Sequence, residues 1–304
     1  MSISKDALKH VGKETGNAAK IVRPSLTYWQ DVWRRSKQNK AAVTGLIIIS
    51  LLIIMAIIGP HLLPFTYSEQ NFEVKNMPSS AVHWFGTDDL GRDLFVRVWH
   101  GARISLFIGI VSALIVFIVG VIYGGISGYF GGIIDEVMMR IIEILYAIPF
   151  LLYVILLMVV MQPGLKPIII AISAVYWIPM ARLVRGQILA LKEQEYVLAA
   201  RTLGASPIRI IFRHLVPNTL GPIIVLITLA IPEAIFTESW LSFLGLGVSA
   251  PIASWGSLAS DGMQGLRSYP WQIFFPAFFI SLSMLAFNLV GDGLRDALDP
   301  RQRK

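Results

Sequence analysis

The sequence predicts an all-α, polytopic membrane protein with six transmembrane helices and both termini on the same side of the membrane. Three observations predict it. Of the 304 residues, 55% are hydrophobic and only 15% are charged, whereas soluble domains usually carry about 25% charge. Long apolar runs of bilayer-spanning length recur along the chain. The charged residues are also sorted by loop rather than gathered into one basic face, which argues against a nucleic-acid partner and for a lipid bilayer.

The first 40 residues are strongly basic, with nine Lys and Arg against three acids. The stretch from Tyr28 to Arg35 places Trp29, Val32 and Trp33 among cations, which predicts an amphipathic helix on the inner membrane surface. For residues 1–24 a loosely ordered basic tail is the simpler interpretation. The first apolar run starts near Ala41, which is too late for a cleavable signal peptide.

Six apolar runs predict the membrane spans, and the third is interrupted by Pro149. They cover residues 41–63, 104–126, 141–161, 167–181, 220–236 and 271–290. With the N-terminus inside, the inner segments hold 20 Lys and Arg and the outer segments hold six. This positive-inside bias places both termini and the charged segment 182–217 in the cytoplasm.

Glycines recur at helical spacing at Gly120, Gly124, Gly128 and Gly132. Small residues four apart let a second helix approach closely. We expect Gly120 and Gly124 to pack against another helix, and Gly128 to Gly132 to form the turn between the second and third spans.

The cytoplasmic segment EYVLAARTLGASPIRIIFRHLVP, residues 195–217, predicts two short helices joined by a tight turn. Gly204 suits a left-handed residue that ends the first helix. Ser206 suits the N-cap of the second helix, with Pro207 at its first position. We expect this second helix to end at Pro217, where the fifth span begins.

The first of these helices carries a small apolar surface formed by Ala199, Ala200 and Leu203, with Glu195 one turn upstream. Arg209 and Arg213 lie four residues apart on the second helix. Small apolar residues in a water-exposed loop predict that a partner covers them.

The same segment resembles the cytoplasmic motif of ABC importer permeases, Glu-Ala-Ala, three residues, Gly, nine residues, then Ile-x-Leu-Pro. Ala199, Ala200, Gly204 and Pro217 fall in register. Leu198 stands in the Glu place and His214 in the Ile place. The first departure is similar to the oligopeptide and dipeptide branch, where an acidic residue followed by Tyr-Val precedes the alanines.

Five further motifs, in order along the chain, resemble the C-type permease of oligopeptide and dipeptide importers. They are WFGTDDLGRD (84–93), GARIS (101–105), SFLGLG (242–247), SWG (254–256) and GDGLRDALDP (291–300). The resemblance implies a type I importer fold in a bacterial cell membrane. It also implies a homologous second permease subunit, two cytoplasmic ATP-binding subunits and an extracytoplasmic peptide-binding protein.

The resemblance divides the chain into four parts. These are a cytoplasmic N-terminal segment (1–40), the first span with its extracytoplasmic loop (41–103), the permease core (104–292) and a cytoplasmic tail (293–304). Within the core it implies that segment 182–217 is the coupling loop. The residues expected to couple to the ATPases are Glu195, Ala199, Ala200, Gly204 and Arg209.

Acidic residues at membrane depth are candidates for the substrate path. A central acidic residue costs about 2.5–3.5 kcal/mol to insert, so each should face protein or water. For Glu143 we favour an ion pair with Arg140, one turn back. Glu233 follows Pro232 in the fifth span, where either a path role or helix packing explains it. We expect Glu238 and Trp240 to lie at the path or gate, and segment 238–269 to form a re-entrant outer gate that docks the binding protein.

The sequence lacks the residues that several kinds of catalytic and nucleotide-binding site require. The sequence contains no cysteine and no phosphate-binding Gly-x-x-x-x-Gly-Lys-Ser/Thr pattern. We therefore expect no catalytic residue, cofactor or metal, and ATP hydrolysis by partner subunits. His83 with Asp88, Asp89 and Asp93 matches no metal-ligand spacing, and DDLGRD instead predicts a capped, partly self-paired helix start.

Two other functions are compatible with the sequence. Related importers that move nickel chelates or glutathione share these motifs. A proton-coupled secondary transporter would use Glu233 as its proton carrier and would work without nucleotide, although the cytoplasmic coupling motif argues against it.

Overall fold

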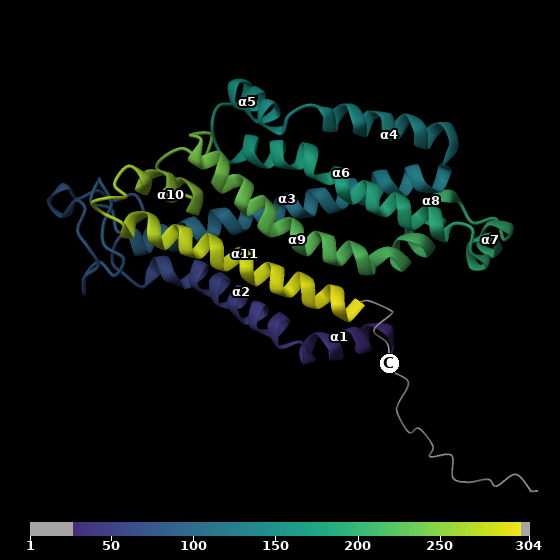
Figure 1. The fold of residues 1–304 in the computed structure, drawn as a ribbon, viewed down its shortest axis with the longest axis horizontal. Coiled ribbons are helices and arrows are strands. Elements are labelled where there is room, and N and C mark those ends of the chain that lie inside the picture. Colours follow the sequence, from purple (N-terminus) through teal and green to yellow (C-terminus); the bar gives the residue numbers. More distant parts are fainter. Residues whose placement is uncertain (1–26, 299–304) are drawn as a thin grey trace, which may run out of the picture.

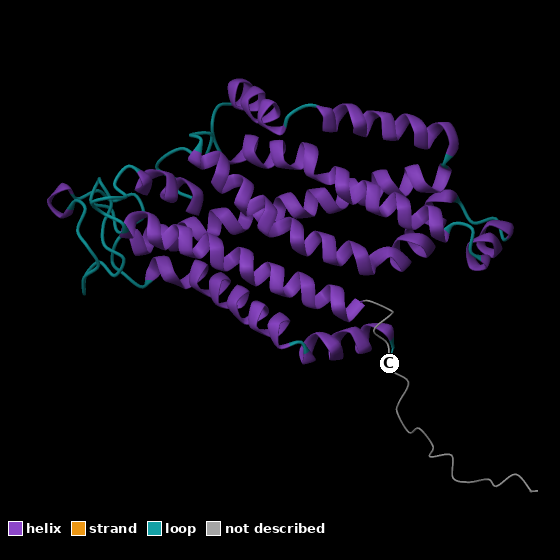
Figure 2. Ribbon diagram, in the orientation of Figure 1, coloured by secondary structure: helices purple, strands orange, loops and turns teal. Residues whose placement is uncertain are grey.

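The computed structural model describes residues 27–298, and their regular structure is helical (Figures 1 and 2). The elements are α1 (Tyr28–Gln38), α2 (Lys40–Ile58), η2 (Gly59–His61), η3 (Phe72–Val74), α3 (Leu94–Phe130), α4 (Gly132–Ala147), α5 (Phe150–Met161), α6 (Leu165–Leu191), α7 (Glu195–Thr202), α8 (Pro207–Ile210), the π-helical turn η4 (Ile211–Leu215), α9 (Val216–Phe243), α10 (Trp255–Met263) and α11 (Trp271–Leu298). The basic tail expected over residues 1–24 and the last six residues of the expected C-terminal tail lie outside this range. The described part of that tail continues α11.

Within residues 27–298, five helical segments are long and apolar enough to cross a membrane, and a sixth crossing arises only if α4 and α5 form one span. These two helices are bent by 79° relative to each other. The third span expected at 141–161 is therefore not one straight helix. Ile148 is extended (φ −80°, ψ 124°), as the residue before a proline prefers to be, and Pro149 follows as the N-cap of α5.

Helix α3 begins at Leu94, ten residues before the expected start of the second span. Its N-cap is Asp93, whose side chain accepts a hydrogen bond from the Val96 amide at 2.9 Å. Two cations in these added turns have partners within the protein. Arg97 is buried and bonds Asp88 at 2.7 Å, and Arg103 donates to the Ala56 carbonyl at 2.5 Å. The domain boundary expected at residue 103 thus falls within one helix.

The glycine stripe on α3 packs against α6, as expected for Gly120 and Gly124. A Cβ on Gly124 would lie 2.3 Å from the Ala181 carbonyl oxygen. The expectation that Gly128 belongs to the turn was wrong. Gly128 lies within α3 and also packs against α6, where an added Cβ would lie 2.9 Å from the Arg185 carbonyl oxygen. The turn itself is made by Gly131 and Gly132, both with positive φ.

The fifth span is longer than expected and is continuous with the segment before it. From Pro207 to Phe243 the helix runs on through η4, so the short helix does not end at Pro217. The π turn shifts the backbone hydrogen bonding just before Pro217, which lies in the first turn of α9 and needs no amide donor there.

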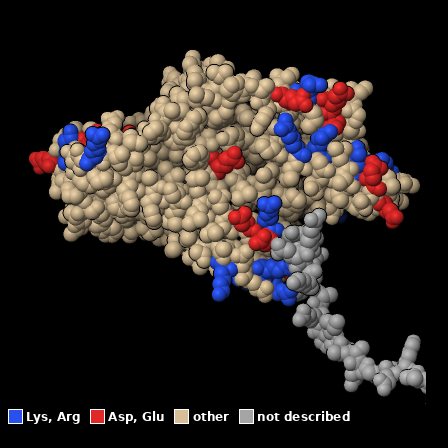
Figure 3. Space-filling view, in the orientation of Figure 1, with Lys and Arg blue, Asp and Glu red and all other residues tan. Residues whose placement is uncertain are grey.

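The helices lie roughly along one axis, with α10 and the outer loops at the left end of Figure 1 and α7 at the right end. The C-terminal end of α11 and helix α1 lie toward the same end as α7, as the charge count predicts. Figure 3 shows charged side chains gathered toward the two ends of the visible face, with a mostly uncharged middle. The protein is therefore arranged to cross a bilayer along this axis.

Candidate functional site

The cytoplasmic hairpin, defined here as residues 194–210, joins α6 to the long helix that contains α9. Its turn is a Schellman motif, in which Gly204 donates to the Arg201 carbonyl at 3.0 Å and Ala205 donates to the Ala200 carbonyl at 3.1 Å. Gly204 has φ +77°, as expected. Ser206 caps α8 by accepting from the Arg209 amide at 3.4 Å.

Two fully buried side chains help to attach the hairpin to the protein core. Val197 and Ile210 are both fully buried and belong to a cluster formed mainly by α3, α6 and α9. Ile188 at the end of α6 and Leu215 before α9 belong to the same cluster. The hairpin therefore shares one buried cluster with both helices that it connects.

The outer surface of the hairpin is apolar and open. Leu203 is 87% exposed and Ile208 is 70% exposed, with Tyr196 and Leu198 each 41% exposed. Among the residues expected at this site, Glu195, Ala199, Gly204 and Arg209 are exposed, and Ala200 is half-buried. The most exposed large side chains, Leu203 and Ile208, flank the turn rather than lie in the alanine pair. Motif matching missed Ile208, because the resemblance rests on small residues.

At the opposite end, Glu238 is fully buried and bonded to three serines. Ser254 donates to it at 2.6 Å, Ser242 at 2.7 Å and Ser105 at 3.3 Å. These hydroxyls come from the N-cap of α10, from α9 and from α3. A carboxyl group with no exposed area does not contact a passing solute in this conformation, and its bonds link α3, α9 and α10.

Glu233 and Trp240 lie on another face of α9. Trp240 is 41% exposed, Phe236 is 52% exposed and Glu233 is also exposed. Their spacing of three and four residues places them along one stripe of the helix. The structure thus places Glu233 and Trp240 on an exposed stripe of α9 and Glu238 on a buried face of the same helix.

The chain matches a family described as "Binding-protein-dependent transport system inner membrane component" over residues 118–304. Residues 27–78 match "N-terminal TM domain of oligopeptide transport permease C". The chain belongs to this family of permeases. It is therefore a multi-pass protein of the cell membrane and a component of an ABC transporter.

Relatives of the permease cover almost its whole length. It is 59% identical to "Dipeptide transport system permease protein DppC" of Bacillus subtilis (strain 168), over 94% of this chain and 90% of the relative. It is 56% identical to "Oligopeptide transport system permease protein OppC" of the same strain, over 100% and 99%. Among solved structures, the inward-facing MetNI methionine ABC transporter aligns with a TM-score of 0.55 at 19% identity, over 67% of this chain and 96% of that one. This last likeness shows the fold alone.

An ion pair that was not predicted from the sequence links α4 to α6. Arg185 on α6 donates to both carboxylate oxygens of Asp135 on α4, each at 2.5 Å, and Ser127 on α3 also donates to Asp135. Asp135 and Arg185 lie 50 residues apart in the sequence, so no local sequence pattern predicts that they form a pair. The expected Arg140–Glu143 ion pair is present at 2.7 Å between exposed side chains.

The outer loop of the permease contains a second ionic network. Asp88 accepts from Arg92 at 2.6 Å and from Arg97 at 2.7 Å, and His83 bonds Asp93 at 2.8 Å. The DDLGRD motif is thus a capped and self-paired helix start, as expected. Within residues 27–298 no group of three or more possible ligands is placed to hold a metal ion.

Asp261 on α10 lies at the edge of this network, 3.7 Å from Arg97. Burial raises the pKa of its carboxyl group, Arg92 opposes this, and the nearby Asp89 and Asp88 reinforce it, so that together they bring the pKa to about 6. Asp89, Arg92, Arg97 and Asp261 line a hollow of about 260 Å³ on the outer surface.

Proposed function

We propose that this permease is one of two membrane subunits of an ATP-driven peptide importer. The names of its relatives support the peptide class, because proteins 59% and 56% identical to it are dipeptide and oligopeptide transport permeases. The match of residues 27–78 to the N-terminal domain of oligopeptide transport permease C supports it independently of the core.

The observation that carries the mechanism is the exposed apolar tip of the cytoplasmic hairpin. Leu203 and Ile208 are open to water, whereas Val197 and Ile210 are locked into the core. Burial of Leu203 and Ile208 by a partner would contribute about 1.5–3 kcal/mol of binding free energy for each fully covered side chain. We infer that this partner is a cytoplasmic ATPase, because the sequence has no phosphate-binding loop of its own.

Force on the hairpin reaches both helices that it joins. Val197 and Ile210 contact the same buried cluster as Ile188 of α6 and Leu215 before α9. Movement of the docked ATPase would therefore shift α6 and α9 together, between discrete inward-open and outward-open arrangements. In this mechanism Glu195, Ala199, Ala200, Gly204 and Arg209 shape the docking surface and its turn.

The other partners follow from the remaining exposed surfaces. The stripe of Glu233, Phe236 and Trp240 suits the path or the face of a homologous second permease. The outer hollow around Asp261 suits an extracytoplasmic peptide-binding protein, with Glu238 holding α10 in place beneath it.

Transport into vesicles tests the proposed energy source. The permease, its second subunit and the ATPases are reconstituted with the binding protein, and uptake of a labelled peptide is measured with and without ATP. We expect uptake only when ATP and both ATPases are present. Uptake driven by a proton gradient without nucleotide would instead support a secondary transporter, with Glu233 as the proton carrier.

Competition tests the substrate class. Unlabelled peptides of graded length, glutathione and a nickel chelate compete with a labelled peptide for ATP-driven uptake. Peptides should compete, and the length that competes best defines the preference. Stronger competition by the nickel chelate or by glutathione would assign the permease to one of those importers.

A further inference from the structure

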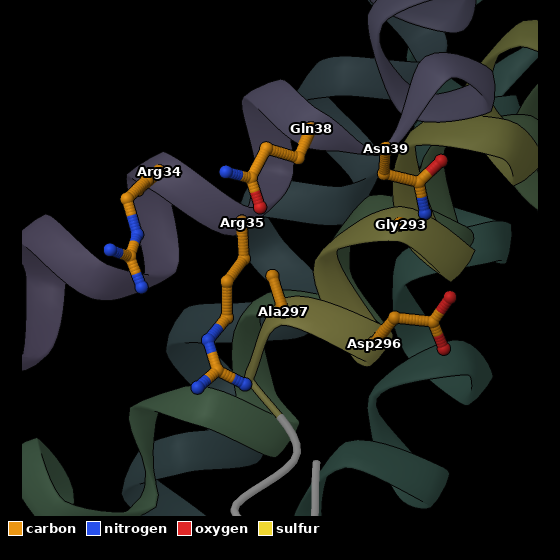
Figure 4. A pocket seen from close by; sticks show the side chains of 7 residues that line it. All are labelled: Arg34, Arg35, Gln38, Asn39, Gly293, Asp296 and Ala297. Carbon is orange, nitrogen blue, oxygen red and sulfur yellow. The ribbon is translucent and has the colours of Figure 1, made fainter. Parts of the chain in front are cut away.

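Helix α1 has two different sides. Arg34, Arg35 and Gln38 line a polar hollow of about 370 Å³, which Asp296 and Ala297 of α11 complete (Figure 4). Asp31 bonds Arg34 at 3.0 Å and Arg35 at 2.9 Å along this helix. This side of α1 suits water.

The other side of α1 borders an apolar groove of about 350 Å³. Its walls come from α1, α2, α9 and α11. They include Trp29 and Trp33 of α1, Leu46 of α2, Ile224 of α9 and Leu294 of α11. Ser36 and Lys37 are the polar residues that line it. The volume lies within the range of about 300–1,000 Å³ that is typical of sites for small molecules.

The groove lies on the part of the permease that faces lipid. Helices α2, α9 and α11 are membrane spans, and Leu46 is 51% exposed. Trp29 is 48% exposed and Trp33 is 59% exposed, and tryptophans collect at the boundary between hydrocarbon and headgroups. Since the polar hollow lies on the other side of α1, this helix lies along the inner membrane boundary.

A cation stands beside the apolar walls. The Lys37 amino group lies 4.8 Å from the centre of the Trp33 ring, and Lys40 follows at the first residue of α2. Lysines near the membrane surface attract anionic lipids. An apolar groove with a lysine at its wall matches a molecule that has a hydrocarbon chain and a negative headgroup.

We propose that this groove binds one anionic phospholipid of the inner leaflet, with an acyl chain between α1 and α11 and the phosphate at Lys37. The lipid would fill the space between Trp33 and Leu294 and hold α1 against the spans. The proposal concerns a lipid site and stands apart from the coupling role of the hairpin.

Fluorescence quenching tests the site in the full chain. The permease is placed in phosphatidylcholine nanodiscs that contain a low fraction of a lipid with bromine on its acyl chain, either phosphatidylglycerol or phosphatidylcholine. The signal of Trp29 and Trp33 is the difference between the protein and its W29F/W33F double variant. We expect brominated phosphatidylglycerol to quench this signal about fivefold more effectively than brominated phosphatidylcholine at equal fractions.

Two variants locate the headgroup. Lys37→Glu should abolish the preference for phosphatidylglycerol. Lys75→Glu is the matched control, because Lys75 also lies over an aromatic ring, 5.8 Å from the centre of Phe72, but on the outer loop. It should leave the preference unchanged. A preference that survives Lys37→Glu would overturn the assignment of the phosphate to that residue.

The unmodified protein keeps the test decisive if a variant misfolds. Equal quenching by the two brominated lipids would show ordinary contact with the bilayer and overturn the site. No quenching by either would show that neither lipid reaches the groove, and would overturn the site as well.

Discussion

The turn residue Gly204 gives the first prediction. A Cβ at this position would meet no atom within 4 Å, but its φ is +77°. Gly204→Ala should therefore destabilise the hairpin through its backbone conformation alone, by about 1–2 kcal/mol. Gly204→Pro should abolish transport, because it also removes the hydrogen bond to the Arg201 carbonyl.

Gly186→Ala is the matched control for this prediction. A Cβ on Gly186 would also meet no atom within 4 Å, but Gly186 lies inside helix α6. Alanine should stabilise it by about 0.5–1 kcal/mol. Thermal unfolding and peptide uptake of both variants are measured side by side. Equal behaviour of the two alanine variants would contradict the role of the left-handed turn.

The carboxyl group of Asp261 gives a prediction on pH. Its pKa is raised from about 4 in the unfolded chain to about 6, so between these values the folded state binds more protons than the unfolded state. The free energy of unfolding should therefore fall as pH rises through this window. Asp261→Asn should remove that part of the pH dependence. Unfolding midpoints of both proteins are compared from pH 4 to pH 7, and a constant difference between them would contradict the raised pKa.

Residues whose role depends on neighbours in sequence were predicted from the sequence. The left-handed Gly204, the caps at Ser206 and the self-paired DDLGRD motif all use contacts within a few residues. The burial of Glu238 was not predicted, because its serine partners include Ser105, 133 residues away. Likewise, the Asp135–Arg185 pair depends on how α4 packs beside α6.

The packing of α3 against α6 gives a prediction at the scale of elements. A Cβ on Gly124 would lie 2.3 Å from the Ala181 carbonyl oxygen, which belongs to rigid backbone. A Cβ on the adjacent Gly125 would meet only side-chain methyl groups, of Ile211 at 3.2 Å and of Ile188 at 3.8 Å. Gly124→Ala should therefore cost about 1–3 kcal/mol and Gly125→Ala clearly less. Unfolding of the two variants in one detergent checks this order, and the reverse order would contradict the packing.

Element boundaries were harder to predict than element types. Pro149 correctly indicated an interruption, but the 79° bend between α4 and α5 depends on how α5 packs beside α6. Pro217 led to the prediction that the short cytoplasmic helix ends there. The helix instead continues into α9 through the π turn over Ile211–Leu215. Helix α3 begins ten residues before the expected span, because Arg97 and Arg103 interrupt the apolar run and their partners, Asp88 and the Ala56 carbonyl, lie outside the helix.

At the scale of the whole molecule, the proposed coupling surface and the proposed outer gate lie at opposite ends of the long axis. The cytoplasmic hairpin lies at one end and α10 lies at the other, and the long helices α3, α6 and α9 run between them (Figure 1). Helix α3 contacts both α6 and α9 closely. A displacement of the hairpin can therefore reach the outer end through packed helices rather than through flexible loops.

Cross-linking tests most directly whether the hairpin is the surface that the ATPases engage. The chain has no cysteine, so single cysteines report without background. Leu203→Cys lies at the hairpin tip, and Leu244→Cys, where the native side chain is 46% exposed, is the control at the outer end of α9. Each variant is reconstituted with its partner subunits and treated with a reagent that joins a thiol to an amine. The account predicts a permease–ATPase product from Leu203→Cys alone, whereas no product from it, or equal products from both variants, would contradict the account.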